Sequence, residues 1–472
     1  MATALQADNY RPAHAIDEIA DFMADPVSPA DFPKHVLRFR NDRAAATVGL
    51  DGLDDAAWLT HFGRFEPLPD AQPRPLALRY HGHQFRVYNP DLGDGRGFLF
   101  AQLRESAAAG GRLLDLGTKG SGLTPWSRTA DGRLTLKGGV REILASEMLE
   151  ALGVTTSRSF SLVETGEQLV RGDEPSPTRS AVLVRLSHGH IRIGSFQRLA
   201  WLGETDHLAR LTDYCLRHLL ALPAGPVPAL TLLDAAVARA ADLAASYMVA
   251  GFVHGVLNSD NIAITAESFD YGPWRFTPHW TPGFTAAYFD RTGLYSFSRQ
   301  AEAIHWNLAQ LAQSLSPLAD TDALIESLRR YPALYETRLV ARFLWRLGMA
   351  APDAETARAA VVAMVEALLT GEVLIDRFFL DWRRGDRNGP AYAGERWDRA
   401  RAAIPPLTPV PGALDHDYWR GEAPCSMHIE EVEAIWSAIA ERDDWSPLHA
   451  RIEAVRAMGA AHGAVTEWAV TE

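Results

Sequence analysis

Residues 251–272 read GFVHGVLNSDNIAITAESFDYG, and this stretch decides the fold. It sets Asp260 and Asn261 side by side and brings a second carboxylate, Asp270, into a turn shortly afterwards. Carboxylate and amide oxygens are the ligands that Mg²⁺ prefers in proteins. The stretch therefore predicts a metal site built from two neighbouring loops, joined by a short strand over residues 261–265.

The same stretch resembles the catalytic segment of protein kinases, in which His-x-Asp-x-x-x-x-Asn is followed by a short strand and Asp-Phe-Gly. Counted from His254, the asparagine position falls on Asn261, and Asp270 opens the metal-binding turn. The position of the kinase catalytic aspartate holds Val256, and the available carboxylate is Asp260. The pattern favours binding of a nucleotide with Mg²⁺ but not ordinary transfer of the γ-phosphoryl group.

Groups that suit a triphosphate lie upstream. Lys119 ends an apolar strand and Glu142 follows on the next helix, the order that aims an ammonium group at phosphates. Gly93 and Gly95 let backbone N–H groups approach phosphate oxygens, and Arg96, directly after Gly95, adds donors. Taken singly, a glycine turn or a strand-end lysine is more often structural, so their common order carries the interpretation.

Two arginines and a second glycine turn complete the candidates. Arg185 ends another apolar strand, where its charge needs either a buried acidic partner or a bound phosphate. Arg192 follows seven residues later, and the turn at Asp131 and Gly132 is by itself a plain loop or hairpin.

Composition excludes several classes of protein. The 472 residues include 46 Lys plus Arg and 59 Asp plus Glu, which gives a net charge of −13 and excludes a general nucleic-acid binder. Hydrophobic residues make up 47%, enough for a sizeable core. No signal peptide is visible, and the most apolar stretch, 235–257, is interrupted by Arg239, Asp242 and His254. We expect a soluble, cytoplasmic protein without a membrane partner.

Cysteine content is low. Cys215 and Cys425 allow neither a disulfide framework nor a four-thiolate zinc site, and we expect two free thiols in a reducing compartment.

The pattern of elements predicts an α+β, two-lobed, protein-kinase-like fold with an N-terminal extension and a largely helical C-terminal lobe. The expected divisions are 1–75 for an extension of helical turns and loops, 76–200 for a lobe with the nucleotide-binding loops, and 201–472 for a helical lobe with the catalytic loop and metal site. The expected strands are 97–103, 112–119 and 180–186, with a hairpin of 159–163 and 168–171 that turns at Thr165-Gly166. The expected helices are 136–152, 205–222, 230–252, 301–316 and 321–347.

A chain of motifs runs in order along roughly residues 75–310. The motifs are YHGHQF at 80–85, LGDGRG at 92–97, KGSGLTP at 119–125, SR at 127–128, DGR at 131–133, RE at 141–142, SE at 146–147, GVTT at 153–156, IRIGSF at 191–196, the stretch 251–262, DYGP at 270–273 and WN at 306–307. Together they resemble the selenoprotein O family, kinase-fold proteins that act as protein adenylyltransferases.

The resemblance implies a flipped ATP, with the γ-phosphate buried and the α-phosphate facing a protein substrate. It implies that Asp260 accepts the proton, that Asn261 and Asp270 bind Mg²⁺, and that Glu142 partners Lys119. By the same carry-over, the nucleotide would be held by Gly93, Gly95, Arg96, Lys119, Asp131, Gly132, Arg185, Arg192 and Asp270.

This chain departs from the family at two places. Members commonly have a cysteine or selenocysteine near the C-terminus, whereas residues 464–472 read AVTEWAVTE, so no redox role passes to Cys425. Phe85-Arg86 stands where the family usually has Phe-Gly.

The leading hypothesis is transfer of AMP from ATP to a Ser, Thr or Tyr hydroxyl of a protein, with Mg²⁺, or alternatively Mn²⁺, and release of pyrophosphate. Transfer of UMP from UTP, transfer of a phosphoryl group, and a non-catalytic pseudokinase scaffold that binds ATP are the alternatives. Val256 favours the scaffold, whereas the joint presence of Asp260, Asn261 and Asp270 favours an enzyme. The protein substrates and the oligomeric state are not encoded in any motif.

Overall fold

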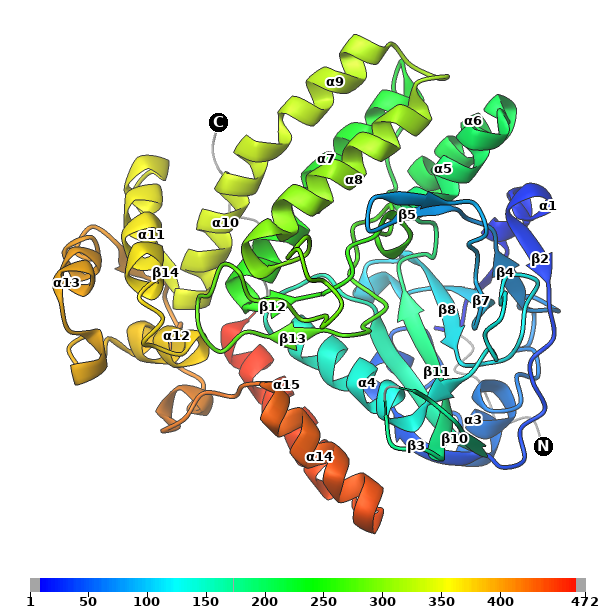
Figure 1. Cartoon of the computed structure of the whole chain (residues 1–472), viewed down its shortest axis with the longest axis horizontal. Coiled ribbons are helices and arrows are strands. Elements are labelled where there is room, and N and C mark those ends of the chain that lie inside the picture. The colour runs from blue at the N-terminus through cyan, green and yellow to red at the C-terminus, as the bar shows by residue number, and fades with distance from the viewer. Residues whose placement is uncertain (1–8, 173, 464–472) are drawn as a thin grey trace.

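The structure is a computed structural model that describes residues 9–172 and 174–463. The terminal stretch 464–472, in which the redox residue of the family was sought, lies outside them. Strands gather in one lobe and long helices in the other (Figure 1), so the predicted two-lobed α+β, kinase-like fold is confirmed. The boundaries at residues 75 and 200 stay predictions. Within the described ranges, no helix is long and apolar enough to cross a membrane.

The strand-rich lobe is built on one antiparallel sheet. Its order is β2-β4-β7-β8-β11-β10-β3, with β1 paired to β7 and β9 to β11. The strands are β1 (Pro12–Ala13), β2 (Ala24–Pro26), β3 (Val36–Arg40), β4 (Leu76–Leu78), β7 (Leu99–Arg104), β8 (Leu113–Lys119), β9 (Leu134–Thr135), β10 (Arg158–Leu169) and β11 (Thr178–Ser187). Three short two-stranded ribbons are β5 (Gly82–Gln84) with β6 (Val87–Asn89), β12 (Phe252–Val253) with β13 (Arg275–Phe276), and β14 (Met349–Ala350) with β15 (Thr408–Pro409).

The helices divide between the lobes. Those of the strand-rich lobe are α1 (Ala20–Met23), α2 (Asp42–Ala46), α3 (Asp55–Phe62) and α4 (Leu136–Ala151). Those that follow are α5 (Ile193–Leu202), α6 (Thr205–Tyr214), α7 (Pro228–Ala250), α8 (Gln300–Leu315), α9 (Thr321–Arg329), α10 (Tyr331–Leu347), α11 (Ala354–Leu368), α12 (Ile375–Arg384), α13 (Glu395–Ala402), α14 (Ile429–Arg442) and α15 (Ser446–His462).

Helix α4 confirms the helix predicted over 136–152. The Thr135 side chain accepts a hydrogen bond from the N–H of Gly138 and so caps the first turn. Gly153, with φ of +75°, ends the helix in the left-handed conformation that favours glycine. Helix α4 packs against β10 and β11 and also against α15, so it is held from both sides.

Strand β10 corrects the predicted hairpin. The chain does not turn back at Thr165-Gly166; it runs on as one strand as far as Leu169, and its register against β11 shifts between Glu164 and Gln168. Gly166, with φ of +78°, provides the bulge, and the buried Thr165 hydroxyl pairs with that of Ser180 on β11. The Thr-Gly pair therefore marks a β-bulge and not a chain reversal.

Three further expectations need correction. Residues 261–265 form no strand, only an isolated bridge between Ala263 and Arg192. The helix expected over 321–347 is two helices that meet at Arg330, because Pro332 has no N–H to continue the hydrogen bonds of α9. The segment before residue 75, expected as helical turns and loops, also supplies strands β1, β2 and β3 to the main sheet.

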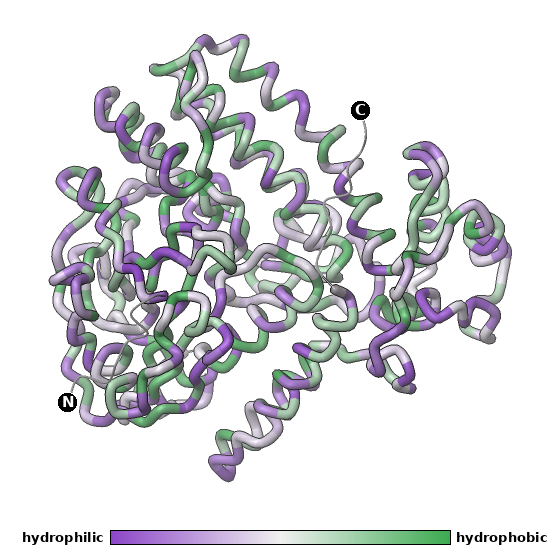
Figure 2. The backbone as a smooth tube through the Cα atoms, turned by 180° about the vertical axis from the view of Figure 1, so that it is seen from behind, coloured by the Kyte–Doolittle hydropathy of each residue, from purple (hydrophilic) through white to green (hydrophobic). Residues whose placement is uncertain are grey.

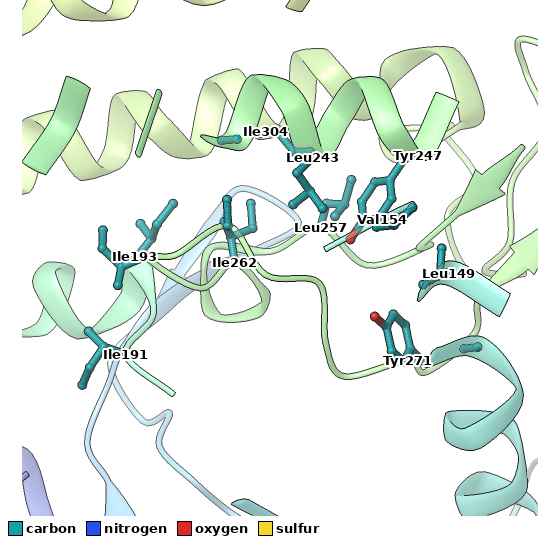
Figure 3. Packing of buried hydrophobic residues seen from close by; sticks show 14 of the residues in the cluster. Leu149, Val154, Ile191, Ile193, Leu243, Tyr247, Leu257, Ile262, Tyr271 and Ile304 are labelled. Carbon is teal, nitrogen blue, oxygen red and sulfur yellow. The ribbon is translucent and has the colours of Figure 1, made fainter. Parts of the chain in front are cut away.

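A continuous apolar core joins the lobes beneath the catalytic segment. Leu243 and Tyr247 of α7 and Ile304 of α8 lie close to Leu257 and Ile262 (Figure 3), and all five are buried. The helices that project from the body alternate hydrophilic and hydrophobic turns (Figure 2), as expected for helices with one buried face. The segment 251–272 is therefore packed against this apolar core.

An ion pair ties the last helix to α4. Arg456 of α15 donates to both oxygens of the buried Glu147 carboxylate, at 2.8 and 2.6 Å. Removing Arg456 leaves the buried Glu147 with only Arg43, at 3.7 Å, as a cationic partner. We therefore expect Arg456→Met to lower the free energy of unfolding by about 2 kcal/mol, measured as a shift of the urea midpoint.

The matched control is Arg329→Met, because Arg329 pairs with Glu326 on the surface, where both side chains are exposed. An exposed pair contributes roughly 0–1 kcal/mol, so this variant should unfold close to the unsubstituted chain. Equal shifts in the two variants would contradict a supporting role for α15.

Candidate active site

Three charged side chains meet where the lobes join. Lys119 at the end of β8 forms an ion pair with Glu142 of α4, and its Nζ lies 2.5 Å from Oδ1 of Asp270. Lys119 and Glu142 are buried, whereas a quarter of the Asp270 side chain is exposed. The predicted lysine, glutamate and metal-binding aspartate are thus in direct contact.

Two buried arginines stand beside this cluster. Nη1 of Arg185 lies 3.7 Å from Oδ1 of Asp270, but its Nε and Nη1 form no hydrogen bond within the described residues. Arg192 donates to the carbonyl of Asp260 at 2.8 Å and to Oδ1 of Asp94 at 3.1 Å. Of the two partners considered for Arg185, the acidic side chain is present as Asp270, but this ion pair is long and leaves two donor nitrogens of Arg185 for a further anion.

The cations control the ionisation of Asp270. Burial alone would raise its pKa, but the charges of Lys119, Arg185, Arg96 and Arg192 hold that pKa well below its usual range. Asp270 also has φ of +65°, a left-handed conformation that disfavours residues other than glycine. Such strain is typical of functional positions, and here it presents an ionised carboxylate at the edge of the site.

The turn that carries Asp260 is held by the ribbon β5–β6. The N–H of His83 donates to the hydroxyl of Ser259 at 2.7 Å, and the N–H of Phe85 donates to Oδ1 of Asn258 at 3.0 Å. Asp260 is only 8% exposed, and its Oδ1 has no hydrogen-bond partner within the described residues. Burial, together with the charge of Asp270, raises the pKa of Asp260 to about 6. This carboxyl is therefore set up to exchange a proton near neutral pH.

The oxygen donors of this turn fit a hard divalent cation. Asn261 donates its amide N–H to the carbonyl of Val256 at 3.0 Å, which directs the amide oxygen away from that carbonyl. His254 is fully buried, and its Nε2 lies 3.1 Å from the carbonyl of Phe269, which fixes the approach to Asp270. An amide oxygen and an ionised carboxylate are the donor set that Mg²⁺ and Mn²⁺ accept.

The glycine-rich loop is held close to the segment that follows Lys119. A Cβ on Gly93 would lie 2.3 Å from Cγ of Trp126, so only glycine allows this approach. The hydroxyl of Ser127 donates to the carbonyl of Gly95 at 2.5 Å, and Arg96 remains exposed beside the loop. The loop is therefore rigid before any ligand binds.

The turn at Asp131 and Gly132 stands apart from the charge cluster. The Asp131 carboxylate pairs with Arg171 at 2.8 Å, an arginine that no spacing singled out. The carbonyl of Gly132 accepts from the N–H of Gly122 at 3.2 Å, which anchors the turn on the loop after Lys119. The structure shows no contact between Asp131 and the cluster of Lys119.

Several residues of the site were missed by sequence reasoning. Asp94 lies between the two predicted glycines and receives Arg192, yet only the glycines and Arg96 were read as ligands. Ser259, directly before Asp260, anchors the ribbon. Asp94 and Ser259 are both polar residues inside a motif, and that position was the feature of the sequence that could have identified them. Arg86 has φ of +65°, which explains why glycine suits this position in the family.

Comparisons with known proteins show the family of this chain. The family model described as protein adenylyltransferase SelO matches residues 5–392. A protein named protein nucleotidyltransferase YdiU from Synechocystis is 41% identical over 93% of this chain and 96% of its own length. Its namesake from Gloeobacter violaceus is 43% identical over 96% of this chain and 95% of its own length.

Solved structures also match this chain. One of them is titled ROP2 from Toxoplasma gondii, a virulence factor with a protein-kinase fold and no enzymatic activity, with 14% identity and a TM-score of 0.25 over 58% of this chain and 75% of that one. At that TM-score the likeness supports no conclusion about fold or function.

Substitutions of Arg185 and Arg192 should have different effects on thermal stability. Arg185→Met removes a buried charge that has no hydrogen bond at Nε or Nη1 and whose nearest carboxylate, Asp270, is already paired with Lys119, so thermal unfolding without ligand should occur at an equal or higher temperature. Arg192→Met leaves the buried Asp94 without its cation, so the same measurement should show a loss of about 3 kcal/mol. If the two variants lost stability equally, Arg185 would have a structural role in place of the one inferred here.

Proposed function

The chain belongs to the SelO family of protein nucleotidyltransferases, and from that premise we propose that it transfers AMP from ATP to Ser, Thr or Tyr hydroxyls of proteins. The observation that carries the proposal is Arg185, whose buried Nε and Nη1 have no hydrogen-bond partner within the described residues. Buried guanidinium nitrogens without hydrogen bonds are costly unless an anion binds them.

The charge cluster supports the flipped orientation of the nucleotide. Lys119, Arg185 and Arg192 lie inside the site, so the γ-phosphate, with the largest charge, would be directed inward to them. Gly93 and Gly95 would approach the phosphates with backbone N–H groups, and the exposed Arg96 would neutralise them from outside. A local set of cations is required because the whole chain carries a net charge of −13.

Asp260 supplies the proton acceptor of the proposed reaction. Its carboxylate takes the proton of the acceptor hydroxyl as that oxygen forms a bond to the α-phosphorus, and the bond from the α-phosphorus to the bridging oxygen breaks in line. Pyrophosphate leaves with its charge stabilised by the buried cations. This geometry needs no carboxylate at the position of Val256, because the attack is directed at the α-phosphate and not at the γ-phosphate.

Asn261 and Asp270 are the proposed holders of Mg²⁺, with Mn²⁺ as the alternative. When bound, this ion neutralises charge on the phosphate oxygens. Glu142 keeps Lys119 oriented toward the phosphates, and we assign Asp131 and Gly132 to the nucleotide only through the family resemblance.

The partners follow from the same proposal. The acceptors are proteins, the nucleotide is ATP, and neither a nucleic acid nor a membrane is required. Cys215 and Cys425 are free and buried, which supports a location in the reducing cytoplasm and gives neither thiol a redox role.

Labelled nucleotides test the reaction. With ATP labelled at the α-phosphate, we expect label on protein in the presence of Mg²⁺ and none in an Asp270→Ala variant. Label from the γ-phosphate would identify a kinase and contradict the proposal, while faster transfer from UTP than from ATP would reassign it to UMP transfer. Binding of ATP without either transfer would identify a scaffold.

Substitution of Asp270 and of Asp260 should reduce the rate of transfer to different extents. A general base contributes about 10²–10⁴-fold, whereas charge stabilisation on the phosphates is usually the larger effect. We therefore expect Asp270→Ala to abolish transfer and Asp260→Ala to leave a measurable residual rate in single-turnover experiments at saturating nucleotide and metal. Equal residual rates would refute this division of roles.

A further inference from the structure

An exposed apolar rim lies next to the catalytic turn. Val87, Tyr288 and Phe289, here called the aromatic rim, are 70%, 85% and 46% exposed. The rings of Tyr288 and Phe289 lie 5.1 Å apart, and Val87 comes two residues after Phe85, whose ring contacts that of Phe289. Large apolar side chains that gather on a surface commonly mark a binding face. No function described above uses these three residues.

The rim is connected to Asp260 by direct contacts. The ring of Phe289 lies 5.8 Å from that of Phe85, which lies 5.1 Å from the ring of Tyr295. The N–H of Phe85 and the hydroxyl of Tyr295 both donate to Oδ1 of Asn258, at 3.0 and 2.7 Å. Asn258 opens the turn that carries Asp260, so the rim is linked through Phe85 and Asn258 to the turn of the proposed proton acceptor.

The charges around the rim favour an acidic ligand. Arg291, which donates its backbone N–H to the carbonyl of Phe289, is exposed and forms no ion pair within the described residues. The nearby carboxylates are already engaged, since Glu302 pairs with Arg86 and Asp290 accepts the N–H groups of Leu294 and Tyr295. Arg291 therefore has a charge that is available to pair with an acidic ligand.

We propose that the aromatic rim and Arg291 dock the acceptor protein through an extended segment that carries an apolar and an acidic residue near the modified hydroxyl. The inference rests on the proposed function and adds to it the chemical class of the substrate. Aromatic side chains supply most of the energy at such contacts, and the charge of Arg291 selects against basic segments.

The test compares two acceptors of opposite character. Dephosphorylated β-casein is unfolded, acidic and rich in apolar residues, whereas protamine is basic and poor in them. With ATP labelled at the α-phosphate, the unsubstituted enzyme should prefer casein. In the double variant Val87→Ser, Tyr288→Ser, kcat/KM for casein should fall about tenfold while the Kd of ATP changes by at most about twofold.

Two further variants sharpen the result. Arg291→Glu should weaken transfer to casein and improve transfer to protamine. Ile325→Ser, on the exposed face of α9, is the matched control and should leave both acceptors unaffected.

Several outcomes would overturn the inference. They are equal rates for casein in the rim variant and the unsubstituted enzyme, preference for protamine, label confined to the enzyme or mapped to Tyr288 itself, or a dimer in sedimentation that the rim substitutions dissociate. Absence of α-phosphate transfer to any protein would instead contradict the proposed function, so the two failures are distinguishable.

Discussion

The ion pairs of Lys119 with Glu142 and Asp270 are the constraint on which the rest of the structure depends. Charges removed from water are costly unless they are paired, and these three come from β8, α4 and the turn after the catalytic loop. Satisfying them fixes the sheet, the helix and the catalytic segment relative to one another. The packing of α4 between the sheet and α15 holds this arrangement from behind.

Within the described residues, several buried polar atoms of the site have no hydrogen-bond partner. Arg185 lacks hydrogen bonds at two nitrogens within the described residues, and Arg192 engages a carbonyl and Asp94. Asp260 is buried with a free oxygen. Polar groups left unsatisfied at one place reduce stability, and proteins keep them where function requires them. The arrangement is that of a site prepared for a polyanion and a transferred proton.

Local sequence patterns predict many residues of this site, but few of the hydrogen bonds that hold those residues in place. The order of a strand-end Lys119 and a helical Glu142 was readable because both elements have clear periodicity. The hydrogen bond from His83 to Ser259 joins residues far apart in the chain, so no spacing could reveal it. The sequence predicts a turn at Gly166, where the structure has a bulge. The pairing of β10 with β11 determines which of the two forms, and local sequence does not contain that pairing.

The orientation of the bound nucleotide is the central claim, and a crystal structure with Mg²⁺ and an ATP analogue that carries a methylene bridge between the α- and β-phosphates tests it most directly. The account predicts the γ-phosphate within hydrogen-bond distance of Nε or Nη1 of Arg185 and the α-phosphate facing Asp260. A γ-phosphate that faces Asp260, with Arg185 still without a partner, would contradict it.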